Sequence, residues 1–358
     1  MENDRPIFVV GCPRSGTTML QLMLHAHPRI AIPPETRFLL EGYRIRHEFG
    51  DLSQVDNRRK LADWIVHRKR SRFIDLDLDA DTLFDEIVTG PGTLGSAVGT
   101  VFRAYAARHG KPRWGDKRPA YIDNLDVILR LFPNAQIISI IRDGRDCVAS
   151  LKEMTWHRNG VLGAVSVWAR AVDRADDAAR TLGPHTYHQL RYEDLVRDPA
   201  AELRAICHFL GEDFDPAMLA PAQIAKVAVP KAKTWHVRTH GDVNTDRVQR
   251  WRRSLSPSEL GLCETVLGGR LAAHGYRPAE VALTRAPDLA QLIRYGKVAA
   301  RHDLSRLRRL ALLELERLRP GAPIASQLDL VPVTVPRPAS GQHVTVGAVT
   351  GSDQTAGR

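Results

Sequence analysis

Short apolar runs alternate along the chain with longer stretches whose apolar residues recur at helical spacing. Residues 7–11 (IFVVG) and 136–141 (QIISII) are brief, apolar and rich in β-branched residues, which predicts two buried parallel strands. Residues 186–191 (TYHQLR) fit a third strand. Each of these runs precedes a segment of helical pattern, so the chain predicts β-α units.

Helical spacing begins at Thr17, immediately after the first strand and a Gly- and Pro-containing loop. Three prolines in residues 28–36 exclude a helix there. The other predicted helices are most of 37–110, then 121–132, one starting in RDGRDCVASL, 161–182, 200–210 and about 256–274. Strands that alternate with helices predict an α/β fold, a P-loop-type parallel sheet flanked by helices in a single domain.

The C-terminal part of the chain changes character. Residues 288–318 are rich in Leu and Arg at helical spacing, which favours a solvated or packed helix; contact with an anionic membrane or a partner is the alternative. From Pro320 onward Pro, Gly, Ser and Thr dominate, which predicts a disordered tail. We therefore divide the chain into a domain (1–283), a basic helical extension (284–319) and a tail (320–358).

Composition excludes several classes of protein. Hydrophobic residues make up 43% and charged residues 26% of the 358 positions, unlike collagen, coiled coils or wholly disordered chains. Lys and Arg total 51 against 41 Asp and Glu, a formal charge of +10. This balance favours anionic partners, from nucleotides to acidic membranes, or simply a basic surface.

The cysteines indicate a reducing environment. Cys12, Cys147, Cys207 and Cys263 are far apart and form no CxxC pair, so a zinc site or disulfide framework is not expected. The N-terminal MENDRP is too polar for a signal peptide, and no run reaches the roughly 18 apolar residues of a membrane span. We expect a cytoplasmic protein without a transmembrane segment.

Residues Gly11–Thr18 (GCPRSGTT) form a candidate phosphate loop. The loop has the length of a P-loop, GxxxxGK[ST], but Thr17 replaces the lysine. Glycines allow the backbone N–H groups to turn inward, and the following helix presents its positive end to an anion. Arg14 restores the missing positive charge and is suited to bidentate binding of an oxyanion.

The second predicted strand ends in Arg142, where a Walker B strand would end in Asp. Together with the missing lysine, this weakens a metal-dependent nucleotidase assignment, because such enzymes need both groups around Mg²⁺ and the phosphates. A surface ion pair of Arg142 with Asp143 or Asp146 is the structural alternative.

Two motifs carry a resemblance to sulfotransferases that use 3′-phosphoadenosine 5′-phosphosulfate (PAPS). The run Pro13, Arg14, Ser15, Gly16, Thr17 and Thr18 resembles the family's 5′-phosphosulfate loop. Arg142 at a strand end and Ser150 eight residues later resemble its 3′-phosphate segment. Both motifs in this order are strongly specific for the family.

The resemblance extends over roughly residues 5–276 and is closest to protein-tyrosine sulfotransferases and their bacterial relatives. His27-Pro28, Glu35-Thr36-Arg37 and Gly115-Asp116-Lys117-Arg118-Pro119 resemble segments of that branch. It implies that Tyr192 lies beside the nucleotide, with a core tyrosine as the alternative. It also implies that a late loop, from Val243-Asn244 through Arg250-Trp251-Arg252, closes over the nucleotide with a basic residue. Arg250 is the better match for that residue, and Arg252 and Arg253 are its neighbours. A solvated basic stretch is the alternative.

The resemblance further implies that Glu35 is the general base, while Arg14 and Lys117 neutralise charge on the transferred group. The extended residues after the first helix are long enough to return Glu35 to the loop. Alternatively, Glu35 forms a salt bridge with Arg37 or starts a helix. Other sulfotransferases use a histidine base; His25, His27 and His157 are the candidates here, although a structural role suits each.

We therefore expect metal-independent in-line transfer of a sulfuryl group from PAPS to an acceptor hydroxyl, with release of 3′-phosphoadenosine 5′-phosphate (PAP). The acceptor is a small molecule, glycan, lipid or peptide tyrosine; residues 37–110 and 155–165 are placed to build its pocket. A P-loop kinase or NTPase and a non-catalytic anion-binding protein are the alternatives. No specific nucleic-acid partner is expected, and homo-oligomer formation stays open.

Overall fold

The five strands of the computed structural model form one parallel sheet in the order β2-β3-β1-β4-β5, which confirms the predicted α/β class. The structure describes residues 5–221, 245–318 and 323–328. The strands are β1 (Ile7–Gly11), β2 (Ile30–Ala31), β3 (Arg113–Lys117), β4 (Gln136–Ile141) and β5 (Tyr187–Arg191).

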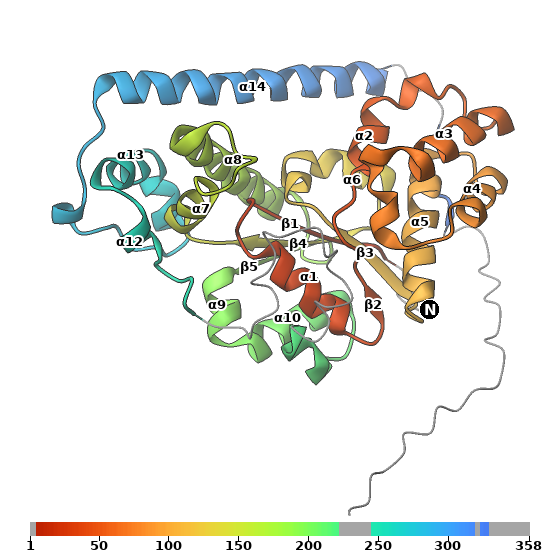
Figure 1. Ribbon diagram of the computed structural model, residues 1–358, viewed down its shortest axis with the longest axis horizontal. Helices are drawn as coiled ribbons and strands as arrows, with labels where there is room; N and C mark the ends of the chain where they lie inside the picture. The colour runs from red at the N-terminus through yellow and green to blue at the C-terminus, as the bar shows by residue number, and fades with distance from the viewer. Residues whose placement is uncertain (1–4, 222–244, 319–322, 329–358) are drawn as a thin grey trace, which may run out of the picture.

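Helices connect the strands and cover both faces of the sheet (Figure 1). Those before β4 are α1 (Thr17–Ala26), α2 (Phe38–Arg44), α3 (Val55–His67), α4 (Ala80–Thr89), α5 (Leu94–Arg108) and α6 (Leu125–Leu131). Those after β4 are α7 (Gly144–Leu151), α8 (Gly160–Thr181), α9 (Tyr192–Arg197), α10 (Pro199–Leu210), α12 (Trp251–Ser254), α13 (Pro257–Ala273) and α14 (Leu289–Leu318). Short 3₁₀ turns occupy Arg46–Glu48, Lys69–Ser71, Phe73–Leu76, Pro119–Asn124, Pro216–Leu219 and Val281–Leu283.

The sheet separates two apolar cores because side chains alternate across a strand. In β1, Ile7 and Val9 belong to the core shared with α1, α9 and α10, whereas Phe8 and Val10 belong to the larger core shared with α5, α8 and α13. Figure 1 shows α1, α9 and α10 below the sheet and α7 and α8 above it. The central strands are therefore covered on both faces, and the polar groups that follow them gather at their carboxyl ends.

Strand β3 has no counterpart among the sequence predictions. Its residues, RWGDK, are all buried although three of them are charged. Arg113 is 1% exposed because its guanidinium bonds the Leu210 carbonyl at 2.8 Å and pairs with Glu212 at 3.1 Å. The strand escapes prediction because its charges are neutralised by residues distant in sequence. The predicted helix at 121–132 is also shorter, since residues up to Asn124 form a 3₁₀ turn before α6.

Residues 323–328, which we expected to be disordered, lie against α5 and correct the start of the predicted tail. The Gly95 amide donates to the Ile324 carbonyl at 2.8 Å, and Ser326 N donates to the Leu131 carbonyl at 2.7 Å. A Cβ on Gly95 would lie 2.4 Å from Ser326 N, so the helix needs glycine there for this close approach. Leu328 is 9% exposed. The chain beyond Leu328 lies outside the described residues.

Within the described residues, no helix combines the length and the apolar character needed to cross a lipid bilayer.

Candidate active site

The loop between β1 and α1 has the geometry of an anion cradle. Arg14 and Gly16 have positive φ angles of 73° and 101°, and Ser15 N donates to the Cys12 carbonyl at 3.1 Å. The Leu20 amide donates to Gly16 O at 3.1 Å, so the amides of residues 17–19 precede the first bond of their helix. These amides and the positive end of α1 favour a bound anion.

Tyr192 closes one side of this loop. A Cβ added to Gly16 would lie 2.6 Å from Tyr192 Cδ2, which shows how closely the ring approaches the loop backbone. The Arg142 guanidinium carbon lies 4.6 Å from the centre of the same ring, a cation–π distance. Tyr192 is therefore buried, as the alternative of a core tyrosine requires, and at the same time forms a wall of the candidate site.

Arg14, Arg142 and Ser150 meet beside the loop. Arg14 Nε donates to Ser150 Oγ at 3.0 Å, and Arg142 Nη1 donates to the Arg14 carbonyl at 3.0 Å. Arg142 is 6% exposed, and its Nε is buried without a hydrogen-bond partner within the described part of the chain. A buried donor of this kind fits a ligand oxygen that completes its bonding.

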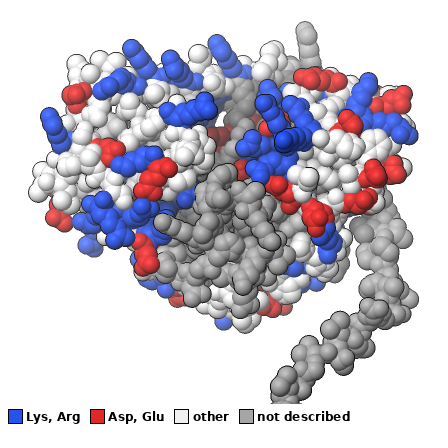
Figure 2. Space-filling view, in the orientation of Figure 1, with Lys and Arg blue, Asp and Glu red and all other residues white. Residues whose placement is uncertain are grey.

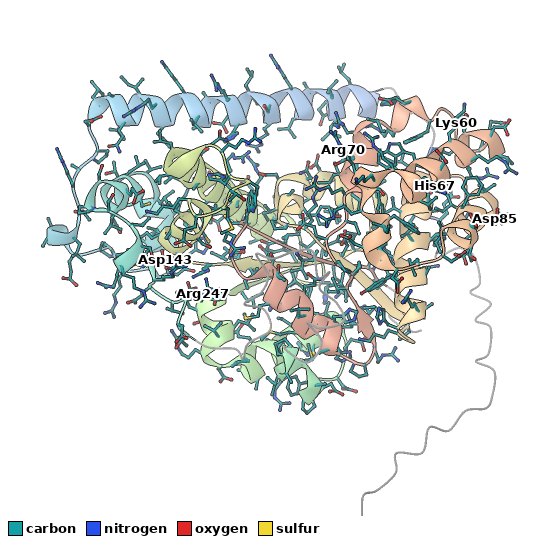
Figure 3. All side chains as sticks on the ribbon, in the orientation of Figure 1. Lys60, His67, Arg70, Asp85, Asp143 and Arg247 are labelled. Atoms are coloured by element: carbon teal, nitrogen blue, oxygen red, sulfur yellow. The ribbon has the colours of Figure 1, made fainter. Side chains whose placement is uncertain are left out.

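A third guanidinium, that of Arg247, joins this pair. Arg142 Nη2 donates to the Arg247 carbonyl at 2.5 Å; Arg247 is labelled in Figure 3. Burial lowers the pKa of Arg14, and the positive charges of Arg247 and Arg142 lower it further. The positive charges around Arg14, beside a cradle of amides, favour an anionic ligand. The sequence analysis missed Arg247; the basic run just after it was the available signal.

The two arginines predicted from that run differ in position. Arg250 Nη2 contacts Glu153 Oε1 at 2.8 Å, and Glu153 interacts electrostatically with Arg14, so Arg250 lies at the edge of the site. Arg252 instead reaches Gln249 at 3.2 Å and Glu280 at 3.5 Å, and 43% of its side chain is exposed. The structure thus does not bring Arg252 together with Arg14 and Arg142, because the turn of α12 directs its side chain outward. Val243 and Asn244 lie outside the described residues.

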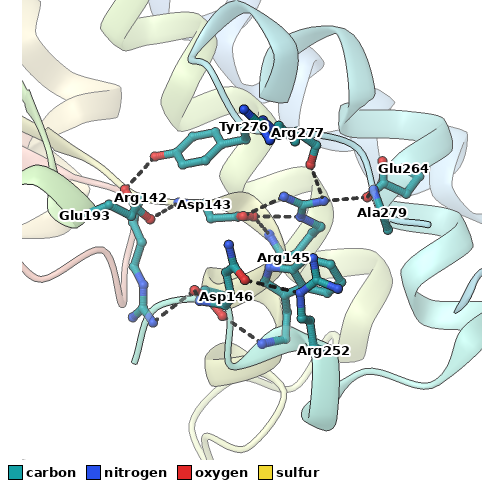
Figure 4. Close-up of polar contacts among 12 residues, drawn as sticks. Arg142, Asp143, Arg145, Asp146, Glu193, Arg252, Glu264, Tyr276, Arg277 and Ala279 are labelled. Carbon is teal, nitrogen blue, oxygen red and sulfur yellow. Dashed lines mark hydrogen bonds and ion pairs between the residues drawn. The ribbon is translucent and has the colours of Figure 1, made fainter. Parts of the chain in front are cut away.

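A buried polar network holds Arg142 and the segment that carries Arg247 (Figure 4). Asp146 accepts hydrogen bonds from the backbone amides of Gln249 at 2.9 Å and Trp251 at 2.8 Å, and lies 3.6 Å from Arg142 Nη2. Burial raises the pKa of Asp146 to about 6, although Arg142 opposes this shift. The ion pair of Arg142 with Asp146 therefore exists, but in the interior rather than on the surface.

Glu35 and Lys117 lie on the other side of the loop. Lys117 Nζ is 3.6 Å from Glu35 Oε2 and 3.4 Å from Thr18 Oγ1, and Arg118 Nε is 3.8 Å from Glu35 Oε1. This confirms that the extended segment after α1 returns Glu35 to the loop. Burial lowers the pKa of Lys117, which is 3% exposed, whereas the Glu35 side chain is 32% exposed. The Glu35 carboxylate is thus accessible from solvent, and it lies beside the buried ammonium group of Lys117.

Asp116 supports both residues from behind. It accepts a hydrogen bond from Lys117 N at 2.8 Å, one from Thr36 Oγ1 at 3.4 Å and a short one from Tyr121 OH. It thereby joins β3, which carries Lys117, to the segment that carries Glu35. Burial raises the pKa of Asp116 from 3.8 to about 6, although the hydrogen bond from Tyr121 opposes the shift. We interpret Asp116 as a positioning residue.

This pKa predicts how Asp116→Asn changes stability. The folded protein keeps the Asp116 proton to higher pH than the unfolded chain does. The free energy of unfolding therefore falls as pH rises from about 4 to about 6. We expect the asparagine variant to escape that loss, gaining up to about 3 kcal/mol relative to the native chain between pH 4 and pH 7. Urea unfolding at four pH values measures it. Asp85→Asn, at an exposed position on α4, is the control. If the unfolding free energies of Asp116→Asn and the native chain differed by the same amount at every pH, the raised pKa of Asp116 would be contradicted.

The three candidate histidines have structural contacts instead. His25 Nδ1 accepts from Ile32 N at 3.1 Å, and burial lowers the pKa of His25 to about 3. His27 Nε2 lies 2.8 Å from the Asp213 carbonyl, and His157 Nε2 lies 2.9 Å from the Gly160 carbonyl. These contacts favour Glu35 as the base. In the described part of the chain, no group of three or more His, Cys, Asp or Glu side chains is placed to hold a metal ion.

Comparisons with known proteins match this arrangement. A family model described as the sulfotransferase family matches residues 6–216. Protein-tyrosine sulfotransferase A of Caenorhabditis elegans is 26% identical over 281 residues, covering 76% of this chain and 67% of that protein. The protein-tyrosine sulfotransferase of Drosophila melanogaster is 25% identical over 283 residues, and the match covers 76% of this chain but only 52% of the Drosophila protein. The solved sulfotransferase domain of the Synechococcus PCC 7002 olefin synthase is 26% identical with a TM-score of 0.53, covering 76% of this chain and 97% of that one.

Proposed function

The chain belongs to the sulfotransferase family and is a sulfotransferase; we propose that it moves a sulfuryl group from PAPS to the hydroxyl group of an acceptor. The observation that carries the choice of donor is the pair of adjacent anion sites. One is the loop with its helix amides, and the other is formed by Arg142 with the buried Nε that has no partner among the described residues. PAPS has phosphate groups at both its 5′ and 3′ ends, so it matches both sites.

We assign the donor contacts accordingly. The backbone of Ser15, Gly16, Thr17 and Thr18, following Pro13, holds the 5′-phosphosulfate. Arg142 and Ser150 hold the 3′-phosphate, and Arg14, which bonds Ser150, lies between the two ends. Tyr192 and Arg142 are stacked, and the nucleotide is bound beside them. Arg247 and Arg250 approach from the late segment and add positive charge.

In the proposed reaction, the acceptor oxygen attacks the sulfur as the bond between sulfur and the 5′-phosphate oxygen breaks. Glu35 takes the hydroxyl proton, and PAP leaves with the electron pair of the broken bond. Lys117 and Arg14 neutralise the charge that grows on the sulfuryl and bridging oxygens. Such fixed cations and amides stabilise the transition state without reorganising, and they do so without a metal ion.

Neither alternative accounts for these features. A kinase or NTPase needs the loop lysine, which Thr17 replaces, and an acidic strand end, where the chain has Arg142. A non-catalytic anion-binding protein needs the arginines but gives no role to the solvent-accessible carboxylate of Glu35 beside Lys117.

The acceptor is assigned here only as a hydroxyl-bearing molecule, either a small molecule, a glycan, a lipid or a peptide tyrosine. Two similar proteins are protein-tyrosine sulfotransferases, and a third is the sulfotransferase domain of an olefin synthase. Family membership is therefore compatible with each of these acceptor classes. We further propose a cytoplasmic location, supported by four free, buried cysteines, and no specific nucleic-acid partner. Residues 1–283 are proposed as the catalytic domain and 284–319 as its helical extension.

Titration calorimetry with PAP, AMP and Mg-ATP tests the donor assignment. PAP and AMP differ by the 3′-phosphate, so we expect PAP to bind at least about 100-fold more tightly than AMP, with or without a chelator. This ratio corresponds to about 3 kcal/mol, which is within the range for a desolvated charge pair. Binding of ATP only in the presence of Mg²⁺, with no binding of PAP, would overturn the proposal and favour an NTPase.

A further inference from the structure

Helix α14 lies along one edge of the molecule, outside α8 and α13 (Figure 1). Its inner face packs on α8, where His302 Nδ1 lies 2.8 Å from Ser166 Oγ and Leu292 and Tyr295 contact the core. Asp288 accepts a hydrogen bond from Gln291 N at 2.7 Å at its start, and residues 323–328 bind α5 beyond its end. The helix is therefore held against α8 by one face, with the opposite face outward.

That outward face carries a stripe of large apolar side chains. Leu289 is 73% exposed, Ile293 51%, Leu304 50%, Leu307 60% and Leu315 59%. At 3.6 residues per turn these positions fall on one side of the helix, opposite the face that packs on α8. The smaller Gly296, Ala300 and Ala311 continue the stripe. Leu312, 60% exposed, lies beside the stripe, so the large exposed apolar side chains are densest between Leu304 and Leu315. Exposed apolar patches of this kind mark interaction sites.

Cations border the stripe along one side. Arg294, Lys297, Arg301 and Arg308 are all exposed and lie next to it around the helix, while Asp303 and Glu314 lie on its other side. Figure 2 shows Lys and Arg side chains projecting along the upper edge of the molecule, where α14 lies in Figure 1. An apolar stripe bordered by cations matches the acyl boundary and headgroups of an anionic bilayer.

We propose that α14 lies in the plane of an anionic lipid surface, with its leucines in the acyl boundary and its arginines at the headgroups. Thirty residues at 1.5 Å each give about 45 Å of helix along the surface. The charge arrangement disfavours a second copy in antiparallel contact, because such a pair would place the cationic sides against each other. The light-scattering measurement below separates lipid from a second copy in parallel contact. This attachment does not depend on the proposed reaction.

Co-sedimentation of the full chain with vesicles tests the proposal. We expect binding to phosphatidylcholine vesicles that contain 30% phosphatidylglycerol and at least 10-fold weaker binding to phosphatidylcholine alone, with a loss at 0.5 M salt. Leu304→Asp/Leu307→Asp should abolish binding, and Arg301→Glu/Arg308→Glu should weaken it on anionic vesicles. Ile74→Asp, at a residue 83% exposed in the turn Phe73–Leu76 and not part of α14, is the matched control and should bind normally.

Two outcomes would overturn this inference. One is a full chain that stays in the supernatant with both vesicle types. The other is a dimer in light scattering that Leu304→Asp/Leu307→Asp converts to a monomer, which would assign the stripe to a second copy. PAP affinity that stays unchanged in the leucine variant establishes that it is folded, so misfolding is not an explanation for lost binding.

Discussion

Glu35→Gln is expected to lower kcat for sulfuryl transfer by about 10²–10⁴-fold while PAP affinity stays within about threefold. The carboxylate is the solvent-accessible acid beside Lys117, 3.6 Å from its Nζ, and the amide keeps its size but cannot take the acceptor proton. PAP formation from PAPS, with 4-nitrophenol or a tyrosine-containing peptide as acceptor, measures the rate. Calorimetry with PAP measures the affinity.

Glu86→Gln on α4 is the control for this prediction, because it removes an exposed carboxylate far along the chain from the loop. Its rate should equal that of the native chain. An unchanged rate in Glu35→Gln would show that the base lies elsewhere. A fall in kcat of about 10²–10⁴-fold in His157→Ala would then identify that histidine as the base.

Arg142→Ala should weaken PAP binding by about 100-fold, or about 3 kcal/mol, because it removes a buried cation from the 3′-phosphate. AMP lacks this phosphate, so its affinity should fall much less and the preference for PAP over AMP should largely disappear. Calorimetry with both nucleotides measures this ratio. Ser150→Ala, which removes one hydroxyl beside Arg14, should shift it in the same direction by a smaller factor.

Arg252→Ala is the matched control, since that arginine is directed toward Glu280 and should not alter either affinity. Equal losses of PAP and AMP in Arg142→Ala would contradict the assignment to the 3′-phosphate. Because Arg142 also bonds the Arg14 and Arg247 carbonyls, a melting curve establishes that the variant is folded.

Strand β1 and the loop after it are features that neighbouring residues were sufficient to predict. Loop residues from Gly11 to Thr18 follow a buried strand and begin a helix, and each of these features is encoded within a few neighbouring residues. Arg142 and Ser150 were predictable for the same reason, since they lie on one strand end and the helix that follows it. The predicted order of strands and helices was therefore sufficient for the α/β class.

Strand β3 and Arg247 show where local sequence fails. The five buried residues RWGDK form a strand only because Glu212 and the Leu210 carbonyl satisfy Arg113, and no local pattern contains those partners. Arg247 is one of several nearby arginines; it was identified by its contact with Arg142, which no spacing predicts. Arg252 lies beside Gln249 and Glu280 rather than beside Arg142, and this position is a property of the folded segment.

The sequence by itself predicted the class of fold and the loop between β1 and α1, because each depends on contiguous residues. The 3′-phosphate roles of Arg142 and Ser150 and the base role of Glu35 followed from the family resemblance of short motifs and stay predictions. Tertiary structure decided that β3 brings Lys117 to Glu35, that Asp116 joins them, that Arg247 completes the cation cluster and that residues 323–328 bind α5. These features depend on contacts between segments up to 229 residues apart, as between Gly95 and Ile324, and the free energy of such contacts is gained only when the whole chain packs.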